Sequence, residues 1–339
     1  MSVAESVTEP GSESGSESES ESDSSARYAY LGPAGTFAEQ ALLAHLGESD
    51  AHLVAAGSVE EALDAVRRGE VDGAMVPLEN SIEGSVSATL DALAFGEPLV
   101  IVAEAQVPVS FALMAAPGTR LADVRTVTTH PHAIAQCRGW LVQNLPAASV
   151  VPSSSTAAAA ASLAGRGPDG GASRASADAA IAAPLAASVY GLSVLASGVG
   201  DHPDAETRFV LVSRPRPPQP ATGADKTTLA LFMGPDHPGA LLELLTELAV
   251  RGINLSRIES RPTGGGLGDY YFCVDAEGHV DDARVGEALI GLRRVCRDVR
   301  YLGSYPRLDG HRPRLRPGVT DEEFAGAQAW LARVREGRV

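Results

Sequence analysis

The chain has 339 residues, enough for two or three domains, and its formal net charge of −16 argues against a nucleic-acid partner, which would require clustered Lys and Arg. It lacks the basic start and apolar core of a secretory signal, and no apolar run reaches the roughly eighteen residues that a membrane helix needs. We therefore expect a cytoplasmic protein.

The first 26 residues form an acidic, serine-rich segment. They include seven acidic residues, no Lys or Arg and no apolar run. Such a composition buries too little to offset the entropy lost on ordering, so we predict a disordered tail over residues 1–26.

Strands and helices are expected to alternate from residue 28 onward. An apolar strand at 28–31 precedes a Gly-Pro turn and the capping-box pair Thr36 and Glu39, which predicts a helix to about residue 46. Ser58 and Glu61 predict a second helix start in the same way. Further strands are expected at 71–76, 99–102, 109–115, 124–128, 149–151, 180–183, 193–196 and 208–213, and further helices at 87–95, 133–144 and 156–164. Near-continuous apolar strands that alternate with helices predict a parallel α/β sheet.

A proline-rich stretch at residues 215–224 separates this block from a second one. Residues 225–306 then predict the order strand, helix, strand, strand, helix, strand, which is that of a ferredoxin-like sandwich. A short amphipathic helix is expected at 322–334, within the C-terminal extension of residues 307–339.

The three cysteines and the eight histidines are scattered along the chain. Cys137, Cys273 and Cys296 fit neither a disulfide framework nor a Cys-x-x-Cys metal site, and we interpret them as buried thiols. His130 and His132 flank a proline and have no third ligand nearby in the sequence, so we expect no metal and assign the pair to a turn.

Residues 76–86 (VPLENSIEGSV) concentrate polar side chains directly after an expected strand. Pro77 should end the strand ladder, which places Glu79, Asn80 and Ser81 where a strand gives way to a helix. Ligands bind at this edge of an open α/β sheet, although the same residues could simply cap the next helix.

Five segments together resemble the prephenate dehydratase family. They are residues 30–37 (YLGPAGTF), 76–86, 129–137 (THPHAIAQC), 154–156 (SST) and 207–209 (TRF). Three further segments resemble the phenylalanine-sensing kind of ACT domain: residues 239–241 (GAL), 259–262 (ESRP) and 302–306 (LGSYP). The resemblance implies an α/β fold with a two-lobed catalytic domain, like a type II periplasmic binding protein, followed by a ferredoxin-like βαββαβ (ACT) domain.

These features give the expected domain organisation. The catalytic domain should cover residues 27–214, with 27–105 and 191–214 in one lobe and 106–190 in the other. The ACT regulatory domain should cover residues 225–306.

The resemblance implies a carbon–oxygen lyase that removes water and carbon dioxide from prephenate to give phenylpyruvate, in phenylalanine biosynthesis. Aromatisation drives this reaction, so the protein needs no cofactor and must supply a donor at the leaving hydroxyl and a pocket that holds the substrate. Two alternatives stay open: an arogenate dehydratase, whose substrate carries an amine in place of the keto group, and a non-catalytic small-molecule binding protein. The implied effector is L-phenylalanine, and the implied assembly is a homodimer or homotetramer.

The same resemblance assigns the site residues. Thr207 is the implied catalytic residue, and Glu79 is considered as the proton source if its pocket raises its pKa. Without the family match, Thr207 would be an ordinary residue that opens a strand. The implied substrate-binding residues are Thr36, Asn80, Ser81, Thr129, Gln136, Ser155, Thr156, Arg208 and Phe209. The implied phenylalanine-binding residues are Gly239, Ala240, Leu241, Glu259, Ser260, Arg261 and Pro262. Strand alternation places Arg208 opposite Thr207, which favours a structural ion pair over a carboxylate clamp for Arg208.

Overall fold

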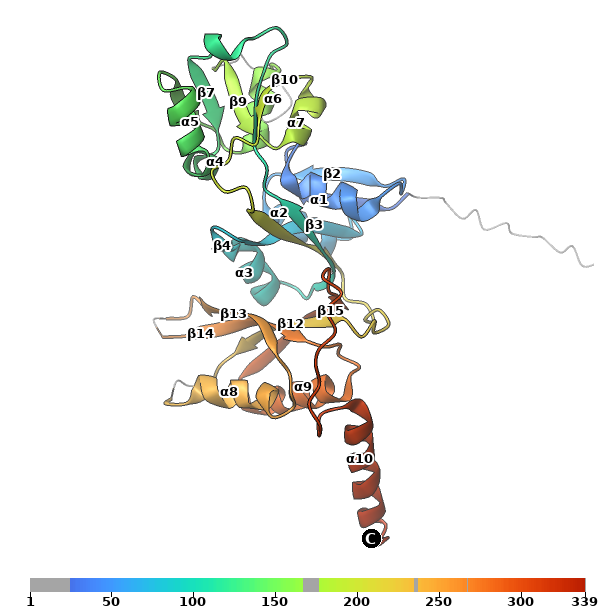
Figure 1. The fold of residues 1–339 in the computed structure, drawn as a ribbon. Coiled ribbons are helices and arrows are strands. Elements are labelled where there is room, and N and C mark those ends of the chain that lie inside the picture. The colour runs from blue at the N-terminus through green and yellow to red at the C-terminus, as the bar shows by residue number, and fades with distance from the viewer. Residues whose placement is uncertain (1–24, 167–176, 235–236, 267, 339) are drawn as a thin grey trace, which may run out of the picture.

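The computed structural model describes residues 25–166, 177–234, 237–266 and 268–338. Nearly all of the tail predicted to be disordered, residues 1–26, therefore lies outside the described residues. The described chain forms three sheets that follow one another along the molecule, and helix α10 (Asp321–Arg335) projects from the end beyond the third sheet (Figure 1). None of its described helices is long and apolar enough to cross a bilayer.

The first sheet has the strand order β2-β1-β3-β11-β5, with the short β4 paired to β3. Its strands are β1 (Arg27–Leu31), β2 (His52–Ala56), β3 (Gly73–Asn80), β4 (Gly84–Ser85), β5 (Val100–Pro108) and β11 (Glu206–Ser213). β1 is parallel to β2 and β3, whereas β11 is antiparallel to both of its neighbours, β3 and β5. The expected parallel α/β sheet is therefore mixed, because β11 enters the first sheet from the second one and runs against the direction of β3.

Three helices pack on the first sheet: α1 (Phe37–Leu46), α2 (Val59–Arg67) and α3 (Ser87–Phe95). Thr36 Oγ1 accepts from the backbone N–H of Glu39 at 3.3 Å, and Ser58 Oγ accepts from that of Glu61 at 3.1 Å. Both predicted N-caps are confirmed, which is expected of signals that lie within a single helical turn.

β3 continues through Pro77 to Asn80, so the prediction that Pro77 ends the strand is wrong. Pairing of β3 with β1 stops at Met75, and a bulge in its pairing with β11 falls beside Pro77. Proline lacks an N–H to donate and is tolerated in strands at such edges and bulges.

The second sheet has the order β10-β6-β9-β7-β8. Its strands are β6 (Ala112–Ala115), β7 (Thr126–Thr129), β8 (Ser149–Pro152), β9 (Ala179–Ala182) and β10 (Ser193–Ser197). Its helices are α4 (Pro131–Gln136), α5 (Arg138–Asn144), α6 (Thr156–Leu163) and α7 (Pro184–Tyr190). A short 3-10 helix, η1 (Leu121–Asp123), lies between β6 and β7. β10 pairs with β6, which corrects the expected placement of residues 191–214 in the first lobe: the chain returns to the first sheet only at β11. The reason is that Ser193–Ser197 finds its partner in β6, a pairing that local sequence does not encode.

The third sheet has the order β13-β14-β12-β15 and confirms the predicted βαββαβ pattern. Its strands are β12 (Asp225–Phe232), β13 (Leu255–Pro262), β14 (Tyr270–Glu277) and β15 (Asp298–Pro306), and its helices are α8 (Ala240–Ala249) and α9 (Ala283–Val295). The two helices bury leucines and valines against one face of the sheet. The other face is turned toward the first sheet (Figure 1).

One apolar cluster joins the first and third sheets. It includes Leu90 and Leu93 of α3 together with Phe232 and Tyr271 of the third sheet. The ring of Phe95 lies 5.5 Å from that of Phe232 and 5.2 Å from that of Tyr271, in edge-to-face geometry. Because such shared packing resists relative movement, a change in the third sheet can reach the first one.

Candidate active site

A cavity of about 590 Å³ lies between the first and second sheets. Its walls come from the first β–α turn, the end of β3, the start of β11, and the N-termini of α4 and α6. The lining residues that the sequence predicted for substrate are Thr36, Asn80, Gln136, Ser155, Thr156, Thr207 and Phe209. The structure thus brings together residues from both lobes that are as much as 173 positions apart in the chain.

Thr207 and Asn80 face each other across the pairing of β11 with β3. Asn80 Oδ1 accepts from the backbone N–H groups of Ile82 and Glu83, at 2.9 and 3.0 Å. These two donors fix the amide orientation, so Asn80 Nδ2 donates to Thr207 Oγ1 at 2.8 Å. Because Thr207 Oγ1 accepts this bond, the hydroxyl proton of Thr207 stays available to a ligand in the cavity.

Helix N-termini supply the positive potential of the cavity. Among the described residues that line it there is no Lys or Arg. Thr36 caps α1, and its hydroxyl also donates to Leu31 O at 2.9 Å. Ser155 caps α6 and accepts from the N–H of Ala158 at 2.9 Å. The N-terminal turns of these two helices carry free backbone N–H groups and partial positive charge, which suits carboxylate ligands.

Glu83 is a site residue that the sequence analysis missed. Its Oε1 accepts from Gln136 Nε2 at 2.9 Å, and its Oε2 lies 2.6 Å from His132 Nδ1. Glu83 follows β3 whereas the other two residues lie on α4, so the carboxylate connects the two lobes beside the cavity. Its position in the motif at 76–86 was a usable signal, but the sequence did not show which acidic residue faces the cavity.

His130 and His132 also line the cavity; instead of the expected turn they form the start of α4, where His130 is the N-cap and His132 lies in the first helical turn. Burial lowers the pKa of His130, and the neighbouring His132 lowers it further, against the opposing effect of Glu83. Within the described ranges, no group of three potential metal ligands is found.

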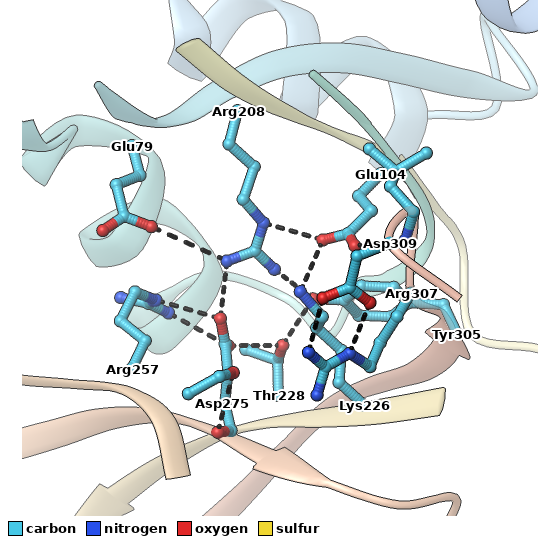
Figure 2. A network of polar contacts seen from close by, with 12 residues as sticks. Glu79, Glu104, Arg208, Lys226, Thr228, Arg257, Asp275, Tyr305, Arg307 and Asp309 are labelled. Carbon is cyan, nitrogen blue, oxygen red and sulfur yellow. Dashed lines mark hydrogen bonds and ion pairs between the residues drawn. The ribbon is translucent and has the colours of Figure 1, made fainter. Parts of the chain in front are cut away.

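Other predicted residues lie outside the cavity lining. Thr129 is buried and donates to Ile181 O at 2.6 Å, and Ser81 Oγ accepts from the backbone N–H of Glu206 at 3.0 Å. Glu79 and Arg208 lie on the face of the first sheet opposite Asn80 and point toward the third sheet (Figure 2). Neither residue is among the described residues that line the cavity, so this geometry does not support Glu79 as proton source or Arg208 as a substrate ligand, whereas Arg208 forms the structural ion pairs that strand alternation favoured.

The predicted effector residues are divided between two places. Ala240 and Leu241 line a small pocket of about 90 Å³ on the third sheet, and Gly239 precedes them with a left-handed φ of 96°. Glu259 instead bonds to Ser85, and the Arg261 guanidinium binds Asp91 of α3 at 3.2 and 2.6 Å. Ser260 and Pro262 are exposed on the same strand. Residues 259–262 are therefore not among the described residues that line this pocket, although the next residue, Thr263, is.

All three cysteines are free and buried, as predicted. Burial raises the pKa of the Cys137 thiol to about 12, and the carboxylate of Asp201 adds to this effect. None of the three thiols is among the residues that line the cavity.

The fold and the cavity define the class: a two-lobed α/β enzyme with a C-terminal ACT domain. Residues 28–217 match the model of the family described as "Prephenate dehydratase", and residues 228–294 match that of the ACT domain. The chain belongs to the prephenate dehydratase family, which are carbon–oxygen lyases, and the family, fold class and activity predicted from its motifs are confirmed.

Relatives extend over nearly the whole chain. A prephenate dehydratase of Amycolatopsis methanolica is 49% identical over 316 residues, which cover 92% of this chain and 99% of the relative. A solved structure of prephenate dehydratase from Arthrobacter aurescens in complex with L-Phe is 51% identical, with a TM-score of 0.84, covering 91% of this chain and 99% of that one. A structure described as a quorum quenching acylase, GqqA, is 31% identical, with a TM-score of 0.72, covering 83% and 97%.

Proposed function

We propose that the substrate is prephenate, bound in the cavity between the two lobes, and that Thr207 hydrogen-bonds to its departing hydroxyl. The observation that carries the proposal is the 2.8 Å bond from Asn80 Nδ2 to Thr207 Oγ1. A hydroxyl that accepts from a fixed amide has its own proton free to donate elsewhere. Thr207 lines the cavity, so that proton can reach a bound ligand.

The proposed reaction breaks two bonds of one substrate molecule. The ring hydroxyl departs, and the carboxylate on the opposite ring carbon leaves as carbon dioxide. The electron pair of the broken bond between the ring and the carboxylate carbon completes the aromatic ring. The departing hydroxide takes up one proton and becomes water. Negative charge grows on the leaving oxygen as its bond breaks, so a hydrogen bond from Thr207 strengthens in the transition state and accelerates the reaction.

The two carboxylates and the ring of prephenate have matching partners in the cavity. We assign the carboxylates to the capped N-termini of α1 and α6, at Thr36 and Ser155, because the described lining offers no Lys or Arg. Phe37, Phe111 and Phe209 line the same cavity and supply apolar surface for the ring. Binding an anion through backbone N–H groups places it without a mobile cationic side chain.

Glu83 takes the place of Glu79 as the acidic residue of the site. Among the described residues that line the cavity it is the one carboxylic acid. We propose that it holds the two lobes together through Gln136 and His132, at 2.9 and 2.6 Å, and so excludes water from the substrate.

We propose that L-phenylalanine binds the ACT domain as a feedback effector and that the chain is a homodimer or homotetramer. The pocket lined by Ala240 and Leu241 supports this proposal, as does the relative whose structure contains L-Phe. We propose that the second half of the site, residues 259–262 on the edge strand β13, comes from a partner subunit. We place the catalytic domain at 27–214 and the ACT domain at 225–306, with β10 in the second lobe.

The proposal is tested by incubating the purified full-length chain with prephenate and, separately, with arogenate. We expect phenylpyruvate from prephenate, measured by its absorbance in alkali, at a kcat/KM well above that for phenylalanine formation from arogenate. Preferential turnover of arogenate would overturn the substrate assignment while leaving the dehydratase activity intact. Absence of turnover of either substrate would overturn the function.

A further inference from the structure

Arg208 follows Thr207 on β11 but points to the opposite face of the strand, toward the third sheet (Figure 2). Its Nε donates to Glu104 Oε2 at 2.8 Å, its Nη1 to Asp275 Oδ2 at 2.6 Å and its Nη2 to Tyr305 Oη at 2.9 Å. Glu104 belongs to the first sheet, whereas the other two partners belong to the third. A single side chain therefore joins the catalytic strand to both sheets.

Neutralising charge is not the only role of Arg208, because Glu104 and Asp275 each contact a second cation. Lys226 Nζ lies 2.9 Å from Glu104 Oε2, and Arg257 Nε lies 3.1 Å from Asp275 Oδ2. If Arg208 were removed, each buried carboxylate would still face one cation. What Arg208 adds is a connection between those carboxylates and β11.

Hydrogen bonds within the third sheet fix the two partners of Arg208 there, Asp275 and Tyr305. Asp275 is fully buried, and its Oδ1 accepts from Thr228 Oγ1 at 2.8 Å. The same Thr228 hydroxyl lies 2.6 Å from Tyr305 Oη. A planar guanidinium group needs all its acceptors in fixed directions, so its contacts weaken when β14 or β15 shifts relative to β11.

We propose that Arg208 is a positioning residue, which sets the direction of the Thr207 hydroxyl according to the position of the ACT sheet. Adjacent strand residues share one peptide unit, so a rotation of the backbone at Arg208 also turns Thr207. An effector that displaces β14 and β15 would act on the cavity through this side chain. The inference rests on the proposed function, because it requires Thr207 to act on prephenate and the ACT domain to bind phenylalanine.

The variant Arg208→Met keeps an unbranched apolar stem similar to that of arginine and removes the guanidinium group. With full-length protein and prephenate, we expect kcat to fall about tenfold, as for a misplaced catalytic group, while KM stays within about twofold of wild type. Inhibition by phenylalanine should be lost although calorimetry still detects phenylalanine binding. Arg208→Lys keeps one charge but reaches fewer acceptors, so we expect an intermediate kcat and partial inhibition.

Lys226→Met is the matched control, because it removes another cation from the same Glu104 carboxylate, at similar side-chain exposure (11% against 15% for Arg208). The control leaves the contacts of Arg208 in place, and we expect kcat and inhibition close to wild type. A purely structural network predicts instead that the two variants lose stability alike and that the folded fraction of each keeps normal kcat and inhibition. Thermal midpoints and active-site titration separate these results.

If Arg208→Met does not fold, Tyr305→Phe removes one contact of Arg208 on the ACT side while the fold is retained. We expect it to raise the phenylalanine concentration for half-inhibition at least threefold. The inference is overturned if Arg208→Met folds and keeps normal kcat and inhibition. If Arg208→Met does not fold, unchanged inhibition in Tyr305→Phe overturns it instead. A wild-type chain that leaves prephenate unconverted overturns the proposed function itself, so the two failures are distinguishable.

Discussion

The direction of the hydrogen bond between Asn80 and Thr207 can be tested by Asn80→Asp. The new carboxylate would keep the two backbone bonds from Ile82 and Glu83, since both are accepted by an oxygen. Its second oxygen, however, replaces the Nδ2 that lies 2.8 Å from Thr207 Oγ1. An ionised carboxylate only accepts, so the hydroxyl of Thr207 would turn to donate to it and would no longer be free for the substrate.

The size of the effect follows from the interaction that is lost. Loss of one preorganised donor to developing negative charge typically costs about 10²–10³ in kcat, and we expect Asn80→Asp to fall in this range. Stability should change by only about 1 kcal/mol, because one hydrogen bond replaces another of reversed direction. KM should rise as well, since the new charge repels a dicarboxylate substrate.

The assay is phenylpyruvate formation at saturating prephenate, measured beside Thr207→Val and Thr207→Ser. Asn80→Asp combined with Thr207→Val should be no slower than Thr207→Val alone, because both changes remove the same donor. Thr207→Ser keeps the hydroxyl and should retain most activity. A kcat for Asn80→Asp within about threefold of wild type, or additive losses in the double variant, would refute this account of the hydroxyl.

Three further predictions concern other parts of the molecule. Thr207→Val should lower kcat by about 10²–10⁴ with little change in substrate binding, and near-normal turnover would show that Thr207 only opens β11. Gly239→Val should weaken inhibition by phenylalanine without affecting uninhibited turnover, because the φ of 96° strains any β-branched residue at the start of α8; unchanged inhibition in steady-state kinetics would contradict this. Burial alone would raise the pKa of Asp275, but Arg257 and Arg208 hold it well below its usual value, so its stabilisation is present above about pH 4 and is lost as the pH falls further. Urea unfolding should therefore show a wild-type advantage over Asp275→Asn that shrinks below pH 4, and an advantage independent of pH would rule out this ion network as its source.

Features set by neighbouring residues, such as helix caps, were predicted correctly from the sequence. Features set by pairing between strands far apart in the chain were not. Thr36 and Ser58 cap their helices as expected, because a cap and its partner lie three residues apart. β10 was placed in the wrong lobe, because its partner β6 lies some eighty residues earlier in the chain. Local pattern carries no information about such a pairing.

The choice between Glu79 and Glu83 shows the same limit within a single motif. β3 runs on through Pro77, and its pairing with β11 has a bulge beside that residue. The register beyond the bulge puts Asn80 opposite Thr207 and turns Glu79 toward the third sheet, while the chain after Asn80 brings Glu83 back to the cavity. A shift of one residue exchanges the two faces of a strand, so residue type alone could not decide which carboxylate faces the cavity.

In the arrangement that we propose, the tripeptide of Thr207, Arg208 and Phe209 serves catalysis and regulation together. Alternation along β11 sends the first and third side chains into the cavity and the second toward the ACT sheet. One face of β11 borders the cavity and the other borders the ACT sheet. Residues on both faces share one backbone, which β3 and β5 hold on either side, so they cannot move independently. A hydroxyl placed on a loop would tolerate movement of the ACT domain without loss of activity. Under the proposed coupling, a hydroxyl on this strand loses its alignment when the ACT domain moves, and inhibition requires no further moving part.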